Sequence, residues 1–201
     1  TIEAATVIRE STIICDKVII YHGAEIGSNS YLADGSLIRE EVVIGENVVI
    51  GTYVVISFNA QVGDKSKIMT RTNIAGNMRI GKGCFIGAHV CAVNDNNPFD
   101  LKQRNQQISA EIKNNVFIGA NTTILPDLII EEGIQVAANS TVTKELKNKN
   151  TLYIGSPAKN RKHEYVTVEH LFYAILTNED FGEKLIEYDI EIAHLLKDLL
   201  E

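Results

Sequence analysis

The sequence predicts a parallel β-helix, and three observations support this fold class. Every sixth residue from Ile2 to Ile86 is Ile, Leu or Val. The residue two places before each of these is mostly small or β-branched, and the residue after it is often Gly. A period of six fits neither an α-helix nor a two-sided strand, but it fits a coil of three short flat sides that share one interior.

The second inward position lies two residues before each aliphatic one. Small or β-branched side chains suit a narrow prism, and they occupy this position at Ala24, Ser30, Ser36, Val42, Val48, Val54, Ala60, Ser66, Thr72 and Cys84. The Gly that follows many of the aliphatic residues, as at Gly27 and Gly45, is expected where the chain bends sharply and a Cβ would crowd the corner.

The register breaks once and then resumes. After Ala92 the next aliphatic residue in phase is Ile112, and the period of six continues to Val142. This step predicts a loop of about fourteen residues inserted into one side of one coil, within about residues 93–111. At eighteen residues per coil, the β-helical domain over residues 1–160 is expected to have about seven coils. Because the repeat is already under way at Ile2 without an initiator Met, we expect a truncated or processed N-terminus, or one that a partner subunit covers.

A helical pattern follows the repeat. Thr167 is a suitable N-cap for a helix with Val168, Leu171 and Phe172 at helical spacing. Further helices are expected near residues 181–187 and 190–200. The sequence therefore predicts a small helical tail at residues 161–201.

Composition excludes several classes of function. The chain has 201 residues, a net charge of −7 and 6% aromatic residues, so it offers no basic field for nucleic acid. We expect no membrane span, because no stretch approaches eighteen apolar residues, and no secretory leader, because the N-terminus carries no charged-then-apolar signal. The three cysteines cannot all pair, and a reducing cytoplasm is the simplest location.

Three segments carry a family resemblance: GANTTILPDLIIEEG at 119–133, VTKEL at 142–146 and GSPAK at 155–159. Together with the repeat and the inserted loop, they resemble the hexapeptide-repeat acyltransferases. The resemblance implies a left-handed β-helix, a homotrimer with active sites between adjacent prisms, and acetyl-CoA as co-substrate. The chain is most similar to members that acetylate sugars, often the amine of a nucleotide-linked amino sugar used for bacterial surface polysaccharides.

Such chemistry requires a group that takes a proton from the attacking amine or hydroxyl. Some relatives carry a His before the loop proline, where this sequence has Asn97, so His89 is the remaining candidate base on the body. The resemblance implies that Asn94 and Asp95 bind or orient the acceptor. The alternatives are an ordinary surface role for His89 and local turn formation by Asn94 and Asp95. An amine acceptor would need only a weak base, which a loop residue or a substrate phosphate could supply.

The resemblance also implies where CoA binds. Backbone amides along the C-terminal coils would hold its pantetheine arm, and the GSPAK turn with nearby cations would face its adenine and phosphates. The corresponding residues are Gly119, Ala120, Ala137, Ala138, Lys144, Gly155, Pro157, Lys159 and Arg161. The alternative is that these cations are solvated residues of the loop by which the chain leaves the β-helix. Asp127 is a departure, since relatives usually carry Gly after the proline.

The tail resembles part of the amino-terminal domain of the Clp ATPases, through KHEYVTVEHLFYAIL at 162–176 and the segment at 179–201. The first helix of that domain's repeat is missing, and a natural fusion, a genetic accident and an engineered chimera remain open. The second functional hypothesis is therefore a non-catalytic β-helical scaffold, or an O-acetyltransferase, whose tail recruits a protein partner. A β-helical carbonic anhydrase is discarded, because its zinc site needs three His and the body has only His22 and His89.

Overall fold

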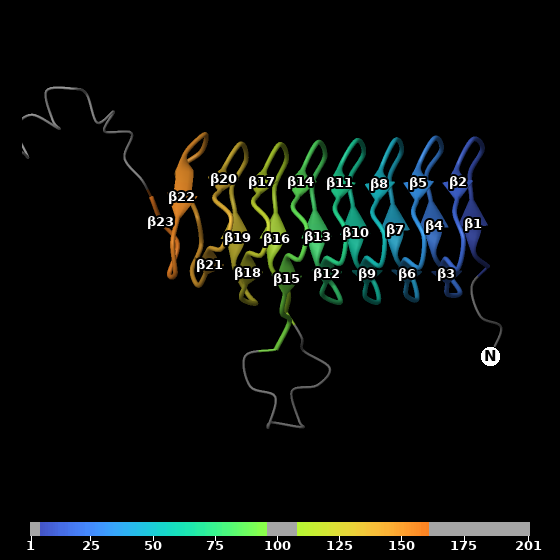
Figure 1. Cartoon of the computed structure of the whole chain (residues 1–201), viewed down its shortest axis with the longest axis horizontal. Helices are drawn as coiled ribbons and strands as arrows, with labels where there is room; N and C mark the ends of the chain where they lie inside the picture. The colour runs from blue at the N-terminus through green and yellow to red at the C-terminus, as the bar shows by residue number, and fades with distance from the viewer. Residues whose placement is uncertain (1–4, 96–107, 161–201) are drawn as a thin grey trace, which may run out of the picture. The chain divides into compact units, whose positions relative to one another are not determined.

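A computed structural model describes residues 5–95 and 108–160, which form a parallel β-helix of three sheets (Figure 1). The first sheet contains β1 (Val7–Ile8), β4 (Glu25–Ile26), β7 (Val43–Ile44), β10 (Gln61–Val62), β13 (Arg79–Ile80), β16 (Glu111–Ile112) and β19 (Ile129–Ile130). The second contains β2 (Ile13–Ile14), β5 (Tyr31–Leu32), β8 (Val49–Ile50), β11 (Lys67–Ile68), β14 (Phe85–Ile86), β17 (Phe117–Ile118), β20 (Gln135–Val136), β22 (Leu152–Ile154) and β23 (Lys159–Asn160). The third contains β3 (Ile19–Ile20), β6 (Leu37–Ile38), β9 (Val55–Ile56), β12 (Asn73–Ile74), β15 (Cys91–Ala92), β18 (Thr123–Ile124) and β21 (Thr141–Val142).

Each coil passes through three corners, which we name by the sheets they join. The first corner lies between the first and second sheets, the second corner between the second and third sheets, and the third corner between the third and first sheets. Neighbouring coils pair in parallel at a spacing of eighteen residues, as between Glu25 and Val43. The residues that follow one another at a corner in successive coils therefore form a column along the β-helix.

The number of coils is about eight rather than the predicted seven. Eight strands of the second sheet run parallel, and only β23 pairs antiparallel, with β22. The period of six ends at Val142, but the chain continues for one more turn at irregular spacing. Leu146 forms a parallel bridge to Ile130, and Tyr153 pairs with Val136. The sequence period misses this coil because its inward residues are no longer six apart.

The interior follows the predicted two positions per side. The aliphatic residues from Ile26 onward are buried, and so are the small residues two places before them. Two inward hydroxyls find backbone acceptors in the next coil, since Ser30 Oγ donates to the Gly45 carbonyl at 3.0 Å and Ser66 Oγ donates to that of Gly81 at 2.8 Å. Turns and core therefore agree in register, as the sequence predicts.

The first coil is an exception to this burial. Ile8 and Ile14 are predicted to face the interior, but they are 46% and 41% exposed. No coil within the described residues stacks on their outer side, so these side chains cover the coil above them and are open to solvent themselves.

The inserted loop leaves and re-enters the β-helix at the third corner, after β15 (Figure 1). The Val93 amide donates to the Ile124 carbonyl at 3.0 Å, and the Asp127 amide donates to the Ile108 carbonyl at 3.1 Å. The latter bond repeats the one from Asn77 to Phe58 below it, so Ile108 takes the corner position directly after Val93. The fourteen inserted residues are therefore 94–107, as the spacing predicts.

Several expectations fall on residues outside the described part of the chain. These are the helical tail at 161–201 with its resemblance to the Clp domain, Arg161, and loop residues 96–107. Within residues 5–95 and 108–160, no helix is long and apolar enough to cross a bilayer.

Candidate functional site

His89 lies on the second corner, in a column of stacked turns. Its amide donates to the Thr70 carbonyl at 3.0 Å, and the Asn121 amide donates to the Ala88 carbonyl at 2.8 Å. His89 therefore sits between Arg71 and Asn121, as eighteen-residue stacking with a one-sided insertion predicts. Its φ of 59° is in the left-handed region, where His and Asn are tolerated better than most residues. The side chain is exposed at this corner.

A strip of small residues begins at the coil of His89 and runs up the same corner. The strip consists of Gly87, Ala88, Gly119, Ala120, Ala137 and Ala138. Gly119 is required there, because a Cβ at that position would lie 2.3 Å from the Ala138 nitrogen. No side chain larger than a methyl group projects from this strip, so a slender ligand could lie close to the backbone.

The amides of the strip are of two kinds. Those of Gly119 and Ala137 donate to the carbonyls of Val136 and Tyr153, at 2.7 and 2.9 Å, and hold the coils together. Ala120 and Ala138 occupy the next position of the same turns and are exposed. A ligand on this strip would therefore meet the turn atoms of Ala120 and Ala138 before those of the other two residues.

The GSPAK segment closes the second corner. It forms the turn between β22 and β23, and two backbone hydrogen bonds with Thr141 attach it to the coil below. The Thr141 amide donates to the Gly155 carbonyl at 3.0 Å, and the Ala158 amide donates to the Thr141 carbonyl at 2.7 Å. Pro157 and Lys159 are exposed on this hairpin. Three coil spacings, about 14 Å in all, separate it from the level of His89.

The other predicted residues lie on the third corner. Asn94 and Asp95 are half-buried and follow Val93, where the inserted loop leaves the coil. Lys144 is exposed after β21, next to the Glu145–Lys147 ion pair of 2.7 Å. One side of the prism, carrying the third sheet, separates this corner from His89. Within one chain, His89, the strip of small residues and GSPAK therefore lie along one edge of the prism, whereas Asn94, Asp95 and Lys144 lie along another.

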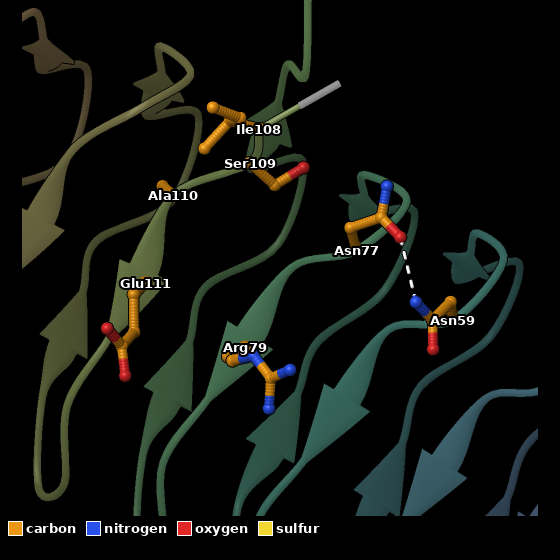
Figure 2. A pocket seen from close by; sticks show the side chains of 7 residues that line it. All are labelled: Asn59, Asn77, Arg79, Ile108, Ser109, Ala110 and Glu111. Atoms are coloured by element: carbon orange, nitrogen blue, oxygen red, sulfur yellow. Dashed lines mark hydrogen bonds between the residues drawn. The ribbon is translucent and has the colours of Figure 1, made fainter. Parts of the chain in front are cut away.

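A pocket that sequence reasoning missed lies where the inserted loop returns to the coil (Figure 2). Its volume is about 360 Å³, and it is lined by Asn59, Asn77, Arg79, Ile108, Ser109, Ala110 and Glu111. Arg79 on β13 and Glu111 on β16 are paired in the register of the first sheet. The sequence could have indicated this pairing, because the two residues take the same outward position in the repeat before and after the insertion.

Comparisons with known proteins identify the repeat. Residues 109–144 match the family model of the bacterial transferase hexapeptide, six repeats. The chain is 39% identical over 94 residues to the bifunctional protein GlmU of Wigglesworthia glossinidia brevipalpis, a match that covers 47% of this chain and 19% of GlmU. It is 38% identical over 84 residues to a Schizosaccharomyces pombe protein described as an acetyltransferase, covering 40% of each. The chain thus spans less than half the length of these relatives.

Solved structures share the fold. AntD, an N-acyltransferase from Bacillus cereus solved with dTDP and coenzyme A, superposes with a TM-score of 0.52 at 24% identity, over 86% of this chain and 92% of AntD. The polysialic acid O-acetyltransferase OatWY superposes with a TM-score of 0.51 at 20% identity, over 90% of this chain and all of OatWY. These structures share the β-helical fold of this chain, and the match of residues 109–144 to the transferase hexapeptide agrees with the repeat that the sequence predicts.

Proposed function

We propose that this chain is an acetyl-CoA-dependent acetyltransferase that acetylates a sugar, with the amine of a nucleotide-linked amino sugar as the preferred acceptor. The observation that carries the proposal is the second corner, where His89, the small-residue strip and the GSPAK hairpin follow one another along a single edge. Acyl transfer from a CoA thioester requires a base, a surface along which the CoA arm can lie, and a cation for its phosphates. His89, the strip of small residues and the exposed Lys159 would supply them.

The separation of about 14 Å between the levels of His89 and the GSPAK hairpin supports a role for acetyl-CoA as co-substrate. The pantetheine arm would lie along Ala120 and Ala138, with its thioester near His89. The phosphates would then reach the hairpin, where Lys159 is exposed and supplies a positive charge in a chain of net charge −7. Arg161 and Lys144 are further candidates for the phosphates, the latter from the third corner of a neighbouring subunit.

The reaction on this edge is a direct acyl transfer. The neutral amine nitrogen of the acceptor attacks the thioester carbonyl carbon, and its proton passes to the His89 imidazole. The carbon–sulfur bond then breaks, and the thiolate of CoA leaves and takes up a proton. Because the amides of Gly119 and Asn121 donate to carbonyls of the adjacent coils, the Ala120 amide is the one that would donate to the oxygen that becomes negative during attack. The products are the acetamido sugar and CoA.

The placement of Asn94 and Asp95 favours a site shared between subunits. These residues lie a full side of the prism away from His89 in the same chain. In a homotrimer, the third corner of one subunit would approach the second corner of the next, which would complete the acceptor site with Asn94 and Asp95 of that neighbour.

The test is acetyl transfer by the full chain, measured by chromatography and mass spectrometry of the sugar product. Thiol reagents are unsuitable, because Cys91 is exposed and would itself react. The acceptors are nucleotide-linked amino sugars, including the dTDP-4-amino-4,6-dideoxyglucose that is bound in a further AntD structure, and matched sugars with only hydroxyl groups. If no acceptor is acetylated and acetyl-CoA does not bind, the chain is not an acetyltransferase.

His89→Asn separates the roles of the imidazole, because Asn fits the left-handed turn that His89 occupies. For an amine acceptor the variant should keep at least a few per cent of the activity, since the amine needs only a weak base. For a hydroxyl acceptor it should lose about 10²- to 10⁴-fold. His22→Asn, at another corner near the opposite end of the column, is the matched control and should leave the rate unchanged.

A non-catalytic scaffold whose tail recruits a protein partner is the second candidate. It predicts no acetyl-CoA binding, and it would be supported if deletion of residues 161–201 abolished capture of a partner while the β-helix stayed folded.

A further inference from the structure

The pocket beside the third corner has a lining that the acyl-transfer proposal does not use. Its walls come from the outward faces of β13 and β16 and from the turns of three successive coils (Figure 2). Its volume of about 360 Å³ falls within the range of about 300–1,000 Å³ that is typical of small-molecule sites.

The two charged residues of the pocket are neighbours that bond to other partners. Arg79 and Glu111 are directly paired in the register of the first sheet. However, Arg79 Nη1 donates to Gln61 Oε1 at 3.0 Å, and Glu111 pairs with Lys113 at 2.7 Å. The guanidinium and the carboxylate therefore line the pocket as separate donor and acceptor groups on adjacent strands.

The rest of the lining is uncharged and consists of two amides, one hydroxyl and the apolar side chains of Ile108 and Ala110. Asn59 Nδ2 donates to Asn77 Oδ1 at 2.9 Å, which fixes both amides at the pocket edge. The Ser109 hydroxyl donates to the Gly76 carbonyl, which holds the returning strand against the coil below. Ile108 is 59% exposed at the rim and offers an apolar surface.

We propose that this pocket binds a pyranose ring through adjacent hydroxyl groups. Each sugar hydroxyl both donates and accepts, so hydroxyls at different positions of one ring match a carboxylate acceptor and a guanidinium donor on adjacent strands. The amides extend the polar contacts, and the apolar face of the ring packs on Ile108. A phosphate matches less well, because Glu111 would repel it.

The proposal is tested by titrating the full chain with the methyl glycosides of glucose, galactose, N-acetylglucosamine and N-acetylgalactosamine, followed by saturation-transfer NMR without acetyl-CoA. At least one glycoside should bind, and both Arg79→Gln and Glu111→Gln should weaken it about tenfold or more, since each removes a charge-assisted hydrogen bond. Lys67→Gln, an exposed outward position on the second sheet, should leave binding unchanged. Thermal melts of all three variants check that the β-helix is intact.

Inorganic phosphate distinguishes an anion site from a sugar site. If phosphate binds, is lost in Arg79→Gln and is strengthened in Glu111→Gln, the pocket is an anion site and the proposal fails. It also fails if no glycoside binds, or if binding is the same in both pocket variants as in the parent chain. Because acetyl-CoA is absent throughout, these outcomes do not depend on whether the chain transfers acetyl groups.

Discussion

Side chains in the middle of the β-helix are buried more deeply than those in its first coil. The same Ile→Ala substitution is therefore expected to lower the free energy of unfolding by different amounts at the two places. Ile14 and Ile50 occupy equivalent positions of the second sheet, two coils apart, but Ile50 is 0% exposed and Ile14 is 41% exposed. Replacing Ile50 with Ala removes three buried carbon groups at about 0.8 kcal/mol each and leaves a cavity, for a total of about 3–4 kcal/mol. Ile14→Ala removes groups that are partly in water and leaves no closed cavity, so about 1 kcal/mol is expected.

Urea unfolding followed by far-UV circular dichroism measures both variants at one protein concentration. The midpoint of Ile50→Ala should fall well below that of Ile14→Ala, with the slope of the transition unchanged. Ile50→Val is the graded control and should lose about 1 kcal/mol. Equal losses for the two Ala variants would refute the reasoning, because Ile14 would then have to be covered as fully as Ile50.

Three further predictions concern other parts of the molecule. Ser36→Ala should raise the melting temperature, because Ser36 Oγ is buried without a hydrogen-bond partner, whereas Ser66→Ala should lower it by removing the bond to Gly81. Lys82 and the Glu46 amide hold the pKa of Asp64 below its usual value, so Asp64 adds stability above about pH 4 that is lost as pH falls through its folded pKa. In Asp64→Asn, the free energy of unfolding measured in urea should therefore fall less steeply on the acid side of the pH curve. Ala120→Leu should raise the KM for acetyl-CoA about tenfold or more by obstructing the small strip, while Ser28→Leu, at the same turn position of the first corner, should not.

The sequence period predicts most of the fold because every side of the prism repeats the same packing problem. One aliphatic and one small residue per six are enough to assign the interior from Ile26 to Val142. The period does not predict the last coil, because the inward residues of that coil, Leu146 and Tyr153, are not six residues apart. It also does not report whether a further coil stacks on a given position, and Ile14, on which no coil within residues 5–95 and 108–160 stacks, is exposed.

The candidate site was only partly predictable. Eighteen-residue spacing places His89 between Arg71 and Asn121 once the insertion is assigned to one side. The separation of Asn94 from His89 was not anticipated, because proximity along the chain suggested proximity in space. The pocket at Arg79 and Glu111 depends on the pairing of β13 with β16, which lie on either side of the insertion. The sequence indicates this pairing only if the fourteen inserted residues are left out when the outward positions are counted.

The inserted loop returns to the corner position next to the one it leaves. Val93 and Ile108 continue the inter-coil hydrogen bonds as if no residues intervened, so the coil does not constrain how many residues lie between them. Loops of other lengths and sequences should therefore be interchangeable at this corner without changing the strand register. If the proposed acetyl transfer is correct, exchange of this one segment is expected to change acceptor preference while the β-helix stays the same.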